Sequence, residues 1–399
     1  MNLPNPTFCL LPWISLETTP VGTVRPCCLA ADEITDTSGQ AYQLTKCDLA
    51  KVRDSAYMQN LRQEFLAGQR PKTCDRCWRE EASGRTSKRQ HTIARLASVI
   101  TNPTQWTAAA ESLQFLDLKL GNVCNLRCRI CGSWSSSTYA VEELAHSERP
   151  KETFHYQMLR AGSWPKNNDV FWSQVAEGVA DLRYIEFTGG EPFMIPEHFA
   201  FLERLVDLGV AGQIEIHYNT NGTIYPEEAP AIWSHFKLVE IAVSIDDVGP
   251  RFEYQRKNAI WAEVQATVAR FQQLRDRQAN ITLQVCATVN ALNVLYLAEL
   301  AQWIEQQAFD FVYWNMLHSA EYFSIAHLPE AAKQLAQHRL EQAQVSADTQ
   351  AEFARIIEFM RQGAAADGSE LCRELVKVDQ RRGENIAKAL PELAGVLGL

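Results

Sequence analysis

The chain has 399 residues, of which 46% are hydrophobic and 22% are charged, and its formal net charge is −10. This composition is typical of an ordinary globular protein and excludes a disordered or fibrous chain. No run of about eighteen uncharged apolar residues occurs, and acidic residues are in excess, so we expect neither a membrane span nor general nucleic-acid binding. No secretion signal is recognised, which predicts a cytoplasmic protein.

The first segment, residues 1–112, is rich in cysteine and poor in long apolar runs. Nine of the 11 cysteines of the chain lie in its first third, and the odd total in a reducing compartment argues against a disulfide framework. We therefore predict a cysteine-rich domain that a metal centre stabilises. The basic side chains of this segment are predicted to form a solvated face: Arg85, Lys88, Arg89 and Arg95.

From residue 113 onward, strand-like apolar runs alternate with amphipathic helical stretches. This alternation predicts βαβ units and a parallel sheet. Six units in about 200 residues are fewer than the eight of a closed barrel, so we expect a partial, open (β/α)6 barrel over 113–324. The chain beyond it, 325–399, is predicted to be helical. The six strands are expected at 113–120, 184–188, 214–218, 239–244, 281–289 and 311–315.

Three cysteines directly follow the first predicted strand of the barrel: Cys124, Cys128 and Cys131. Barrel folds place their active sites at this end of the strands. An iron–sulfur cube normally takes four thiolates, so a loop that offers three leaves one iron open to a further ligand. The alternatives are a buried apolar role, a zinc site with a distant fourth ligand, and a redox Cys-x-x-Cys pair.

The C-x3-C-x2-C spacing resembles the signature of the radical S-adenosylmethionine (radical SAM) superfamily, although Ile130 stands where that family usually has an aromatic residue. The resemblance implies a [4Fe–4S] cluster on the three cysteines, with S-adenosylmethionine bound to its open iron. It further implies reductive cleavage of that cofactor to a 5′-deoxyadenosyl radical, which abstracts hydrogen from a substrate.

Further motifs in the order of the family support this interpretation. The turn after the second predicted strand reads Gly189-Gly190-Glu191-Pro192, and the resemblance implies that it holds the amine of the methionyl group. Read alone, this motif is a plain turn. Polar residues at later strand ends are candidates for the ribose and carboxylate of the cofactor, and each is also an ordinary turn or capping residue: Asn219, Asn221, Ser244, Asp246 and Asn290.

Four cysteines of the first segment resemble the half-size auxiliary-cluster module called the twitch domain, a shortened SPASM domain: Cys9, Cys27, Cys74 and Cys77. The module follows the barrel in well-known relatives and precedes it here. The resemblance implies a second, fully ligated [4Fe–4S] cluster for electron transfer. A structural zinc site with the same ligands is the alternative. Cys28 and Cys47 are left over, and the spacing favours Cys27 over Cys28.

We therefore expect a radical SAM oxidoreductase or maturase with one auxiliary cluster. Its substrate is expected to be a peptide or protein side chain, or a sugar-like metabolite, and its partner a reductant such as flavodoxin or ferredoxin. Cys286, inside the fifth predicted strand, is a candidate hydrogen donor or a buried core thiol. The alternative function is a non-catalytic iron–sulfur or zinc scaffold.

Overall fold

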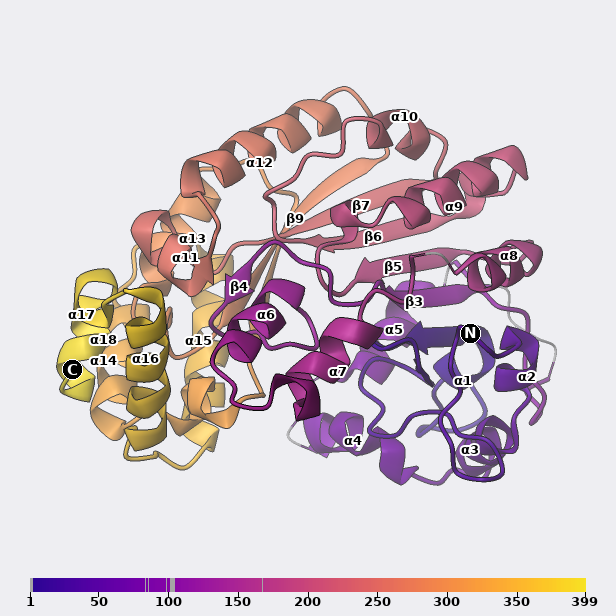
Figure 1. Ribbon diagram of the computed structural model, residues 1–399, viewed down its shortest axis with the longest axis horizontal. Helices are drawn as coiled ribbons and strands as arrows, with labels where there is room; N and C mark the ends of the chain where they lie inside the picture. Colours follow the sequence, from indigo (N-terminus) through magenta and orange to yellow (C-terminus); the bar gives the residue numbers. More distant parts are fainter. Residues whose placement is uncertain (1–2, 83, 85, 98, 101–104, 167) are drawn as a thin grey trace. The chain divides into compact units, whose positions relative to one another are not determined.

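The computed structural model describes residues 3–82, 84, 86–97, 99–100, 105–166 and 168–399 (Figure 1). Two compact units make up the chain. The first comprises Met1–Asn125, Ser133–Tyr218 and Pro226–Glu240, and the second comprises Leu126–Gly132, Asn219–Tyr225 and Ile241–Leu399. Both units are described separately below.

The first unit is built on a mainly parallel sheet with the strand order β2-β1-β3-β5-β6. Strands β1, β3, β5 and β6 run parallel, and β2 pairs antiparallel with β1 at the edge. The bounds are Ser15–Thr18 for β1, Val24–Arg25 for β2, Phe115–Lys119 for β3, Tyr184–Thr188 for β5 and Glu215–Thr220 for β6.

Helix α9 covers one face of this sheet. Ile185 and Phe187 of β5 point to that face and are fully buried, and the Phe187 ring lies 4.8 Å from that of His198 on α9. Each apolar side chain buried in this way contributes about 1.5–3 kcal/mol to folding. The helices of this unit are α1 Leu11–Ile14, α2 Leu49–Arg53, α3 Ala56–Leu66, α4 Asp75–Ala82, α5 Lys88–Leu96, α6 Ser137–Ala145, α7 Phe154–Ala161, α8 Asp169–Glu177, α9 Pro196–Asp207 and α10 Ala229–Trp233.

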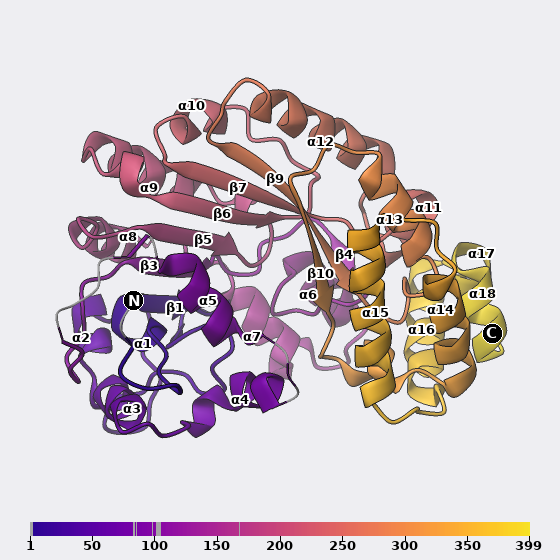
Figure 2. The ribbon, with the colours of Figure 1, turned by 180° about the vertical axis from the view of Figure 1, so that it is seen from behind.

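The second unit carries the strand order β10-β9-β7, with β9 and β10 parallel. Trp314 of β10 packs against Phe353 of α15, with ring centroids 5.9 Å apart. Figure 2 shows these two elements from behind. The strands are β7 Leu238–Ser244, which begins in the first unit, β9 Ile281–Val289, β10 Phe311–Met316, and the short antiparallel pair β4 Arg127–Cys128 and β8 Arg256–Lys257. The helices are α11 Gly249–Gln255, α12 Trp261–Arg275, α13 Leu297–Glu305, α14 Glu330–Glu341, α15 Ala347–Gln362, α16 Ser369–Arg382, α17 Ile386–Ala389 and α18 Pro391–Leu397.

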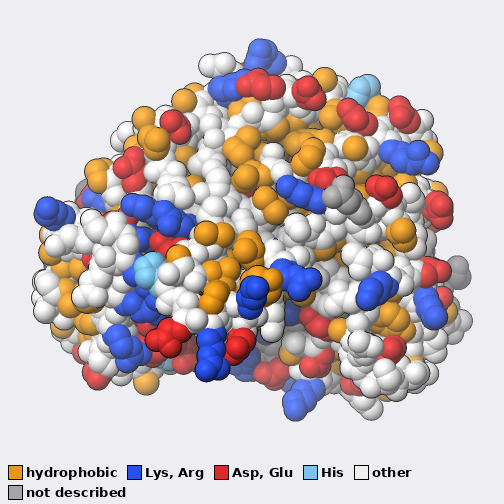
Figure 3. Space-filling view, viewed as in Figure 1, with side chains coloured by type: hydrophobic (Ala, Val, Ile, Leu, Met, Phe, Trp, Pro, Cys, Tyr) orange, Lys and Arg blue, Asp and Glu red, His pale blue; other side chains and the backbone are white. Residues whose placement is uncertain are grey.

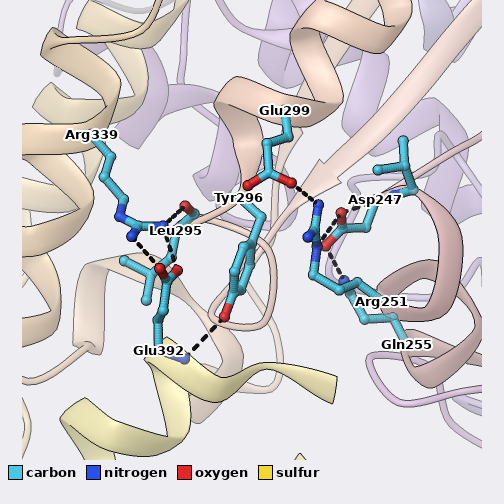
Figure 4. Close-up of polar contacts among 9 residues, drawn as sticks. Asp247, Arg251, Gln255, Leu295, Tyr296, Glu299, Arg339 and Glu392 are labelled. Carbon is cyan, nitrogen blue, oxygen red and sulfur yellow. Dashed lines mark hydrogen bonds and ion pairs between the residues drawn. The ribbon is translucent and has the colours of Figure 1, made fainter. Parts of the chain in front are cut away.

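Polar side chains join the helices of the second unit (Figure 4). Arg251 of α11 pairs with Asp247 at 3.0 Å and with Glu299 of α13 at 2.5 Å, and its guanidinium stacks over the Tyr296 ring. The Tyr296 hydroxyl in turn accepts a hydrogen bond from the backbone amide of Glu392 on α18. Burial raises the pKa of Asp247 to about 7, although Arg251 opposes this shift. The last helix is thus fixed to the strand-bearing part of its unit.

The structure has a strand at each of the six predicted positions, which makes the chain a mixed α/β protein with a parallel sheet, consistent with a partial barrel. Strands β1 and β2 were not expected, and both join the same sheet as β3. That residues 1–112 form a separate auxiliary domain stays a prediction. Within the described residues, no helix combines the length and the apolar character that crossing a membrane requires.

Two candidate cluster sites

The four N-terminal cysteines predicted as ligands line one cavity of the first unit. Cys9 precedes α1, Cys27 follows β2, Cys74 ends a short 3-10 helix and Cys77 lies in the first turn of α4. The cavity encloses about 330 Å³ of empty space, part of it open to solvent. The fold therefore brings together thiols from three separate segments, since Cys74 and Cys77 lie in one stretch of chain. The other lining residues are Leu11, Leu29, Phe65, Lys88 and Arg89.

Arg89 holds two of these segments together. Its guanidinium donates to the backbone carbonyls of Pro6 and Phe8, beside Cys9, at 3.0 and 2.8 Å. The same group forms a two-pronged ion pair with Glu81 of α4, the helix of Cys77, at 2.8 and 2.9 Å. The prediction of a solvated basic face is therefore wrong for Arg89, which is buried. Lys88 also lines the cavity, and Arg85 lies outside the described residues.

Burial makes these thiols hard to ionise. It raises the pKa of Cys27 to about 12 and that of Cys9 and Cys74 further, and repulsion between neighbouring thiolates adds to the shift. A bound cationic centre would supply the missing positive charge, and four thiolates are a ligand set that both an iron–sulfur cube and zinc accept. The donor set therefore fits the implied cluster. Among the described residues, no three His, Cys, Asp or Glu side chains are grouped closely enough to hold a single metal ion.

Cys28 does not line this cavity. Its thiol is buried near Lys88 and Asp117, and burial raises its pKa well above the usual value, although Lys88 opposes the shift. Cys47 is half-buried and does not line the cavity either.

The turn Gly189-Gly190-Glu191-Pro192 packs against the backbone that leads to Cys124, within the first unit. Gly190 has φ +55°, and a Cβ atom on it would lie 2.3 Å from the Val123 carbonyl oxygen. The Glu191 amide donates to that same oxygen at 2.8 Å. Only glycine permits so close an approach at this backbone angle. Two sequence motifs that are 65 residues apart (124 to 189) therefore lie side by side.

Glu191 itself is fully buried, and its carboxylate accepts a hydrogen bond from the Phe193 amide at 3.2 Å. Pro192 begins the 3-10 helix Pro192–Met194 that follows. Cys124 is held from the other side, because its amide donates to the Ser137 hydroxyl at 3.2 Å.

Cys128 and Cys131 belong to the second unit, where the Cys131 amide donates to the Cys128 carbonyl at 3.1 Å. The pKa of the Cys128 thiol lies below its usual value, because a side-chain hydrogen bond with Cys131 and the nearby Arg256 favour the thiolate, although burial opposes them. Arg256 approaches the Cys128 sulfur to 3.9 Å. A thiolate stabilised in this way is ready to bind metal.

Arg129 fixes the same loop to the C-terminal helices of the second unit. Its buried guanidinium lies 2.5 Å from both Asp379 of α16 and Glu384, and it stacks 3.7 Å from the Tyr254 ring. Sequence reasoning missed Arg129 and Arg256 as residues that position the cysteine loop. The partner of Arg129, Asp379, is 250 residues away, and Arg256 itself lies outside the cysteine motif.

Three residues of the second unit that are predicted to contact the cofactor form hydrogen bonds or ion pairs within that unit. Asp246 pairs with Arg256 at 2.6 Å and accepts from the Thr288 amide at 2.8 Å. The Asn221 side chain accepts from the Thr223 amide at 2.9 Å, and that of Asn290 accepts from the Leu292 amide at 2.8 Å. Their contact with a cofactor stays a prediction, as does that of Asn219 and Ser244, which lie half-buried at the ends of β6 and β7.

Cys286 is half-buried in β9, in register with Tyr313 of β10. Its role as a hydrogen donor stays a prediction.

A row of ionisable residues crosses the sheet of the first unit and was missed by sequence reasoning. Glu17, Asp117, Glu186 and His217 are register partners on β1, β3, β5 and β6. Lys119 approaches Glu17 to 2.8 Å, and other cations come from α5, where Lys88 lies 3.5 Å from Glu186 and Arg95 lies 3.4 Å from Glu240. A signal existed on β3, β5 and β6, since each of these strands carries an ionisable residue between two apolar or aromatic neighbours.

Residues 118–303 match the sequence profile of the Radical SAM superfamily. The matched segment is therefore similar to a radical SAM domain. Of the candidate sites, the three-cysteine loop and the Gly-Gly-Glu-Pro turn lie inside the matched segment, and the four N-terminal cysteines lie outside it.

Solved structures with a similar arrangement include anSMEcpe with bound AdoMet, at 16% identity and a TM-score of 0.39 over 57% of this chain and 58% of that one. SuiB of Streptococcus suis bound to S-adenosylmethionine is 11% identical, with a TM-score of 0.35 over 79% of this chain and 68% of SuiB. The chain thus spans somewhat more than half the length of anSMEcpe. No curated protein matches the sequence.

Proposed function

We propose that the chain is a radical SAM enzyme with two [4Fe–4S] clusters. Cys124, Cys128 and Cys131 would hold the cluster that binds S-adenosylmethionine, and the four N-terminal cysteines would hold an auxiliary cluster for electron transfer. Such a cluster, when bound and reduced, would supply the electron for cleavage of S-adenosylmethionine to methionine and a 5′-deoxyadenosyl radical, which would serve for hydrogen abstraction from the substrate.

The observation that carries this proposal is the contact of the Gly-Gly-Glu-Pro turn with the backbone before Cys124. The Gly190–Val123 approach and the Glu191 amide bond place a glycine-rich turn beside the first proposed ligand, inside the matched domain. Glycine at this position lets the chain's own backbone approach the turn, which keeps the turn against the residues that lead to Cys124.

The residues around the loop have separate tasks in this proposal. Arg256 favours the thiolate of Cys128, and Arg129 holds the loop in place through α16. In the N-terminal cavity, Lys88 and Arg89 place positive charge beside the four thiols. This charge would stabilise a cluster with a net negative charge.

The substrate class is a peptide or protein side chain, or a sugar-like metabolite, and flavodoxin or ferredoxin would serve as reductant. Nothing in the site favours one class over the other.

The proposal is tested by anaerobic purification followed by iron, sulfide and zinc analysis. About eight irons per chain are expected for two cubes, whereas about four irons with one zinc would reject the auxiliary cluster. After reduction, S-adenosylmethionine should yield 5′-deoxyadenosine. That release should fall to background when Cys124, Cys128 and Cys131 are all changed to Ala.

A variant with Cys47→Ala and Cys372→Ala is the control, since neither cysteine is a proposed ligand. It should keep both its iron content and its 5′-deoxyadenosine release. If the purified protein binds eight irons yet releases no 5′-deoxyadenosine, the scaffold alternative replaces the proposed enzyme.

A further inference from the structure

A second cavity of the first unit shares no lining residue with the cavity of the four N-terminal cysteines and has a different character. It encloses about 1060 Å³ of empty space, part of it open to solvent. Its walls come from the loop at 45–46, from Lys151, and from one side of α7. The lining residues are Thr45, Lys46, Lys151, Tyr156, Gln157, Arg160 and Ala161. We call it the basic cleft.

The three cations of the basic cleft lack acidic partners. No acidic side chain among the described residues lies within 4.0 Å of Lys46, Lys151 or Arg160, whereas other surface cations of this unit are paired, as Arg79 is with Asp75 and Lys237 with Glu215. Lys and Arg side chains gather over the region of α7 in Figure 3. On a chain whose net charge is −10, such a concentration of positive charge is a local exception.

We propose that the basic cleft binds an acidic peptide segment. Uncompensated cations in a concave site attract carboxylates. Between the cations, Tyr156 offers an aromatic ring and Gln157 an amide that can bond to a peptide backbone. This inference goes beyond the proposed cluster chemistry and does not depend on it.

The cleft does not have the features of a compact phosphate site. Such sites use free backbone amides of a glycine-rich loop or of a helix N-terminus. No glycine is among the lining residues, and the Tyr156 amide at the start of α7 is already bonded to the Thr153 hydroxyl. A nucleic acid is disfavoured as well, because a nucleic-acid site neutralises many phosphates and only three cations among the described residues line this cleft.

The test measures fluorescence anisotropy of a labelled oligo-glutamate peptide with the full-length protein, purified anaerobically, at low salt. An oligo-glutamine peptide of equal length serves as the uncharged probe. Oligo-glutamate is expected to bind more tightly, and the variant Lys46→Gln, Lys151→Gln, Arg160→Gln should weaken its binding at least about tenfold, since three exposed charge contacts are lost. All three residues are exposed, so the variant should retain the far-ultraviolet circular dichroism and melting temperature of the parent.

The matched control changes three exposed cations away from the cleft: Lys51→Gln, Lys237→Gln and Arg355→Gln. It alters the net charge equally and should leave oligo-glutamate binding within about twofold of the parent. The proposal is overturned if the control loses as much affinity as the cleft variant, or if oligo-glutamate binds no better than oligo-glutamine. It is also overturned if a labelled single-stranded oligonucleotide binds more tightly than the peptide through the same three residues.

Discussion

The two cysteine regions are built in opposite ways. The N-terminal cavity brings together thiols from three segments, and the buried Arg89 bonds to two of those segments. The barrel loop carries its three cysteines within eight residues. Arg129 of this loop pairs with Asp379, and Arg256 approaches the Cys128 sulfur. The first site thus depends on the fold, whereas the second is encoded in a short stretch of sequence. A ligand at the first should stabilise the fold, while a ligand at the second should serve chemistry.

The largest expected effect is on cluster content and stability together. Changing Cys74 and Cys77 to Ser should remove about four irons and lower the free energy of unfolding by at least about 3 kcal/mol, because a cluster bound only by the folded chain stabilises it. Changing Cys128 and Cys131 to Ala should remove the other four irons with a smaller loss, since Arg129 still holds the loop. Iron analysis measures the cluster content of each variant, and anaerobic thermal unfolding measures its stability. Equal losses of stability would remove the contrast between the sites.

The next effect concerns Arg89, which bonds both to Glu81 and to the backbone carbonyls beside Cys9. Arg89→Met should cost about 3 kcal/mol in unfolding free energy, because Glu81 and the carbonyls beside Cys9 lose their shared partner in a buried setting. Adding Glu81→Gln should restore part of the loss, as urea unfolding of the single and double variants would show. The control is Arg79→Gln, which removes an exposed cation from α4, the helix of Glu81. If it costs as much as Arg89→Met, the contacts of Arg89 have no special role.

A smaller loss of stability is expected where Gly190 of the Gly-Gly-Glu-Pro turn approaches the backbone of Val123. Gly190→Ala should cost about 2–3 kcal/mol and impair S-adenosylmethionine binding, since its Cβ would lie 2.3 Å from the Val123 oxygen. Gly209 has a similar positive φ with nothing within 4 Å, so Gly209→Ala reports the backbone strain alone, about 1 kcal/mol. Equilibrium binding and urea unfolding separate the two. Identical behaviour of both variants would mean that the contact is unimportant.

The smallest effect distinguishes two neighbouring cysteines. Cys28→Ser should leave the iron content unchanged, because Cys28 does not line the cavity, whereas Cys27→Ser should lower it. Iron analysis of the two variants, purified side by side, decides the matter. An unchanged iron content in Cys27→Ser with a loss in Cys28→Ser would reverse the proposed ligand set.

Local patterns allowed the six strands to be predicted from the sequence, because alternation along a strand is visible in the residues themselves. The pairing of β1 with β3 was missed, since Ser15–Thr18 is only four residues long and its partner lies 100 residues further on. The four N-terminal cysteines were recognised from spacing, but Arg89 was taken for a surface residue because nothing near it in sequence reveals its contact with the carbonyls beside Cys9. The partners of Arg129 were missed for the same reason, since Asp379 is 250 residues away.

The row of ionisable residues across the first unit limits how far the chain can be shortened. A chain beginning at Leu113 would lack Lys88 and Arg95, which neutralise carboxylates on β5 and β7, and would expose the edge of β3 that β1 covers. Buried carboxylates without counter-charges and an open parallel edge both favour self-association. We therefore expect truncation to give aggregates instead of an isolated barrel.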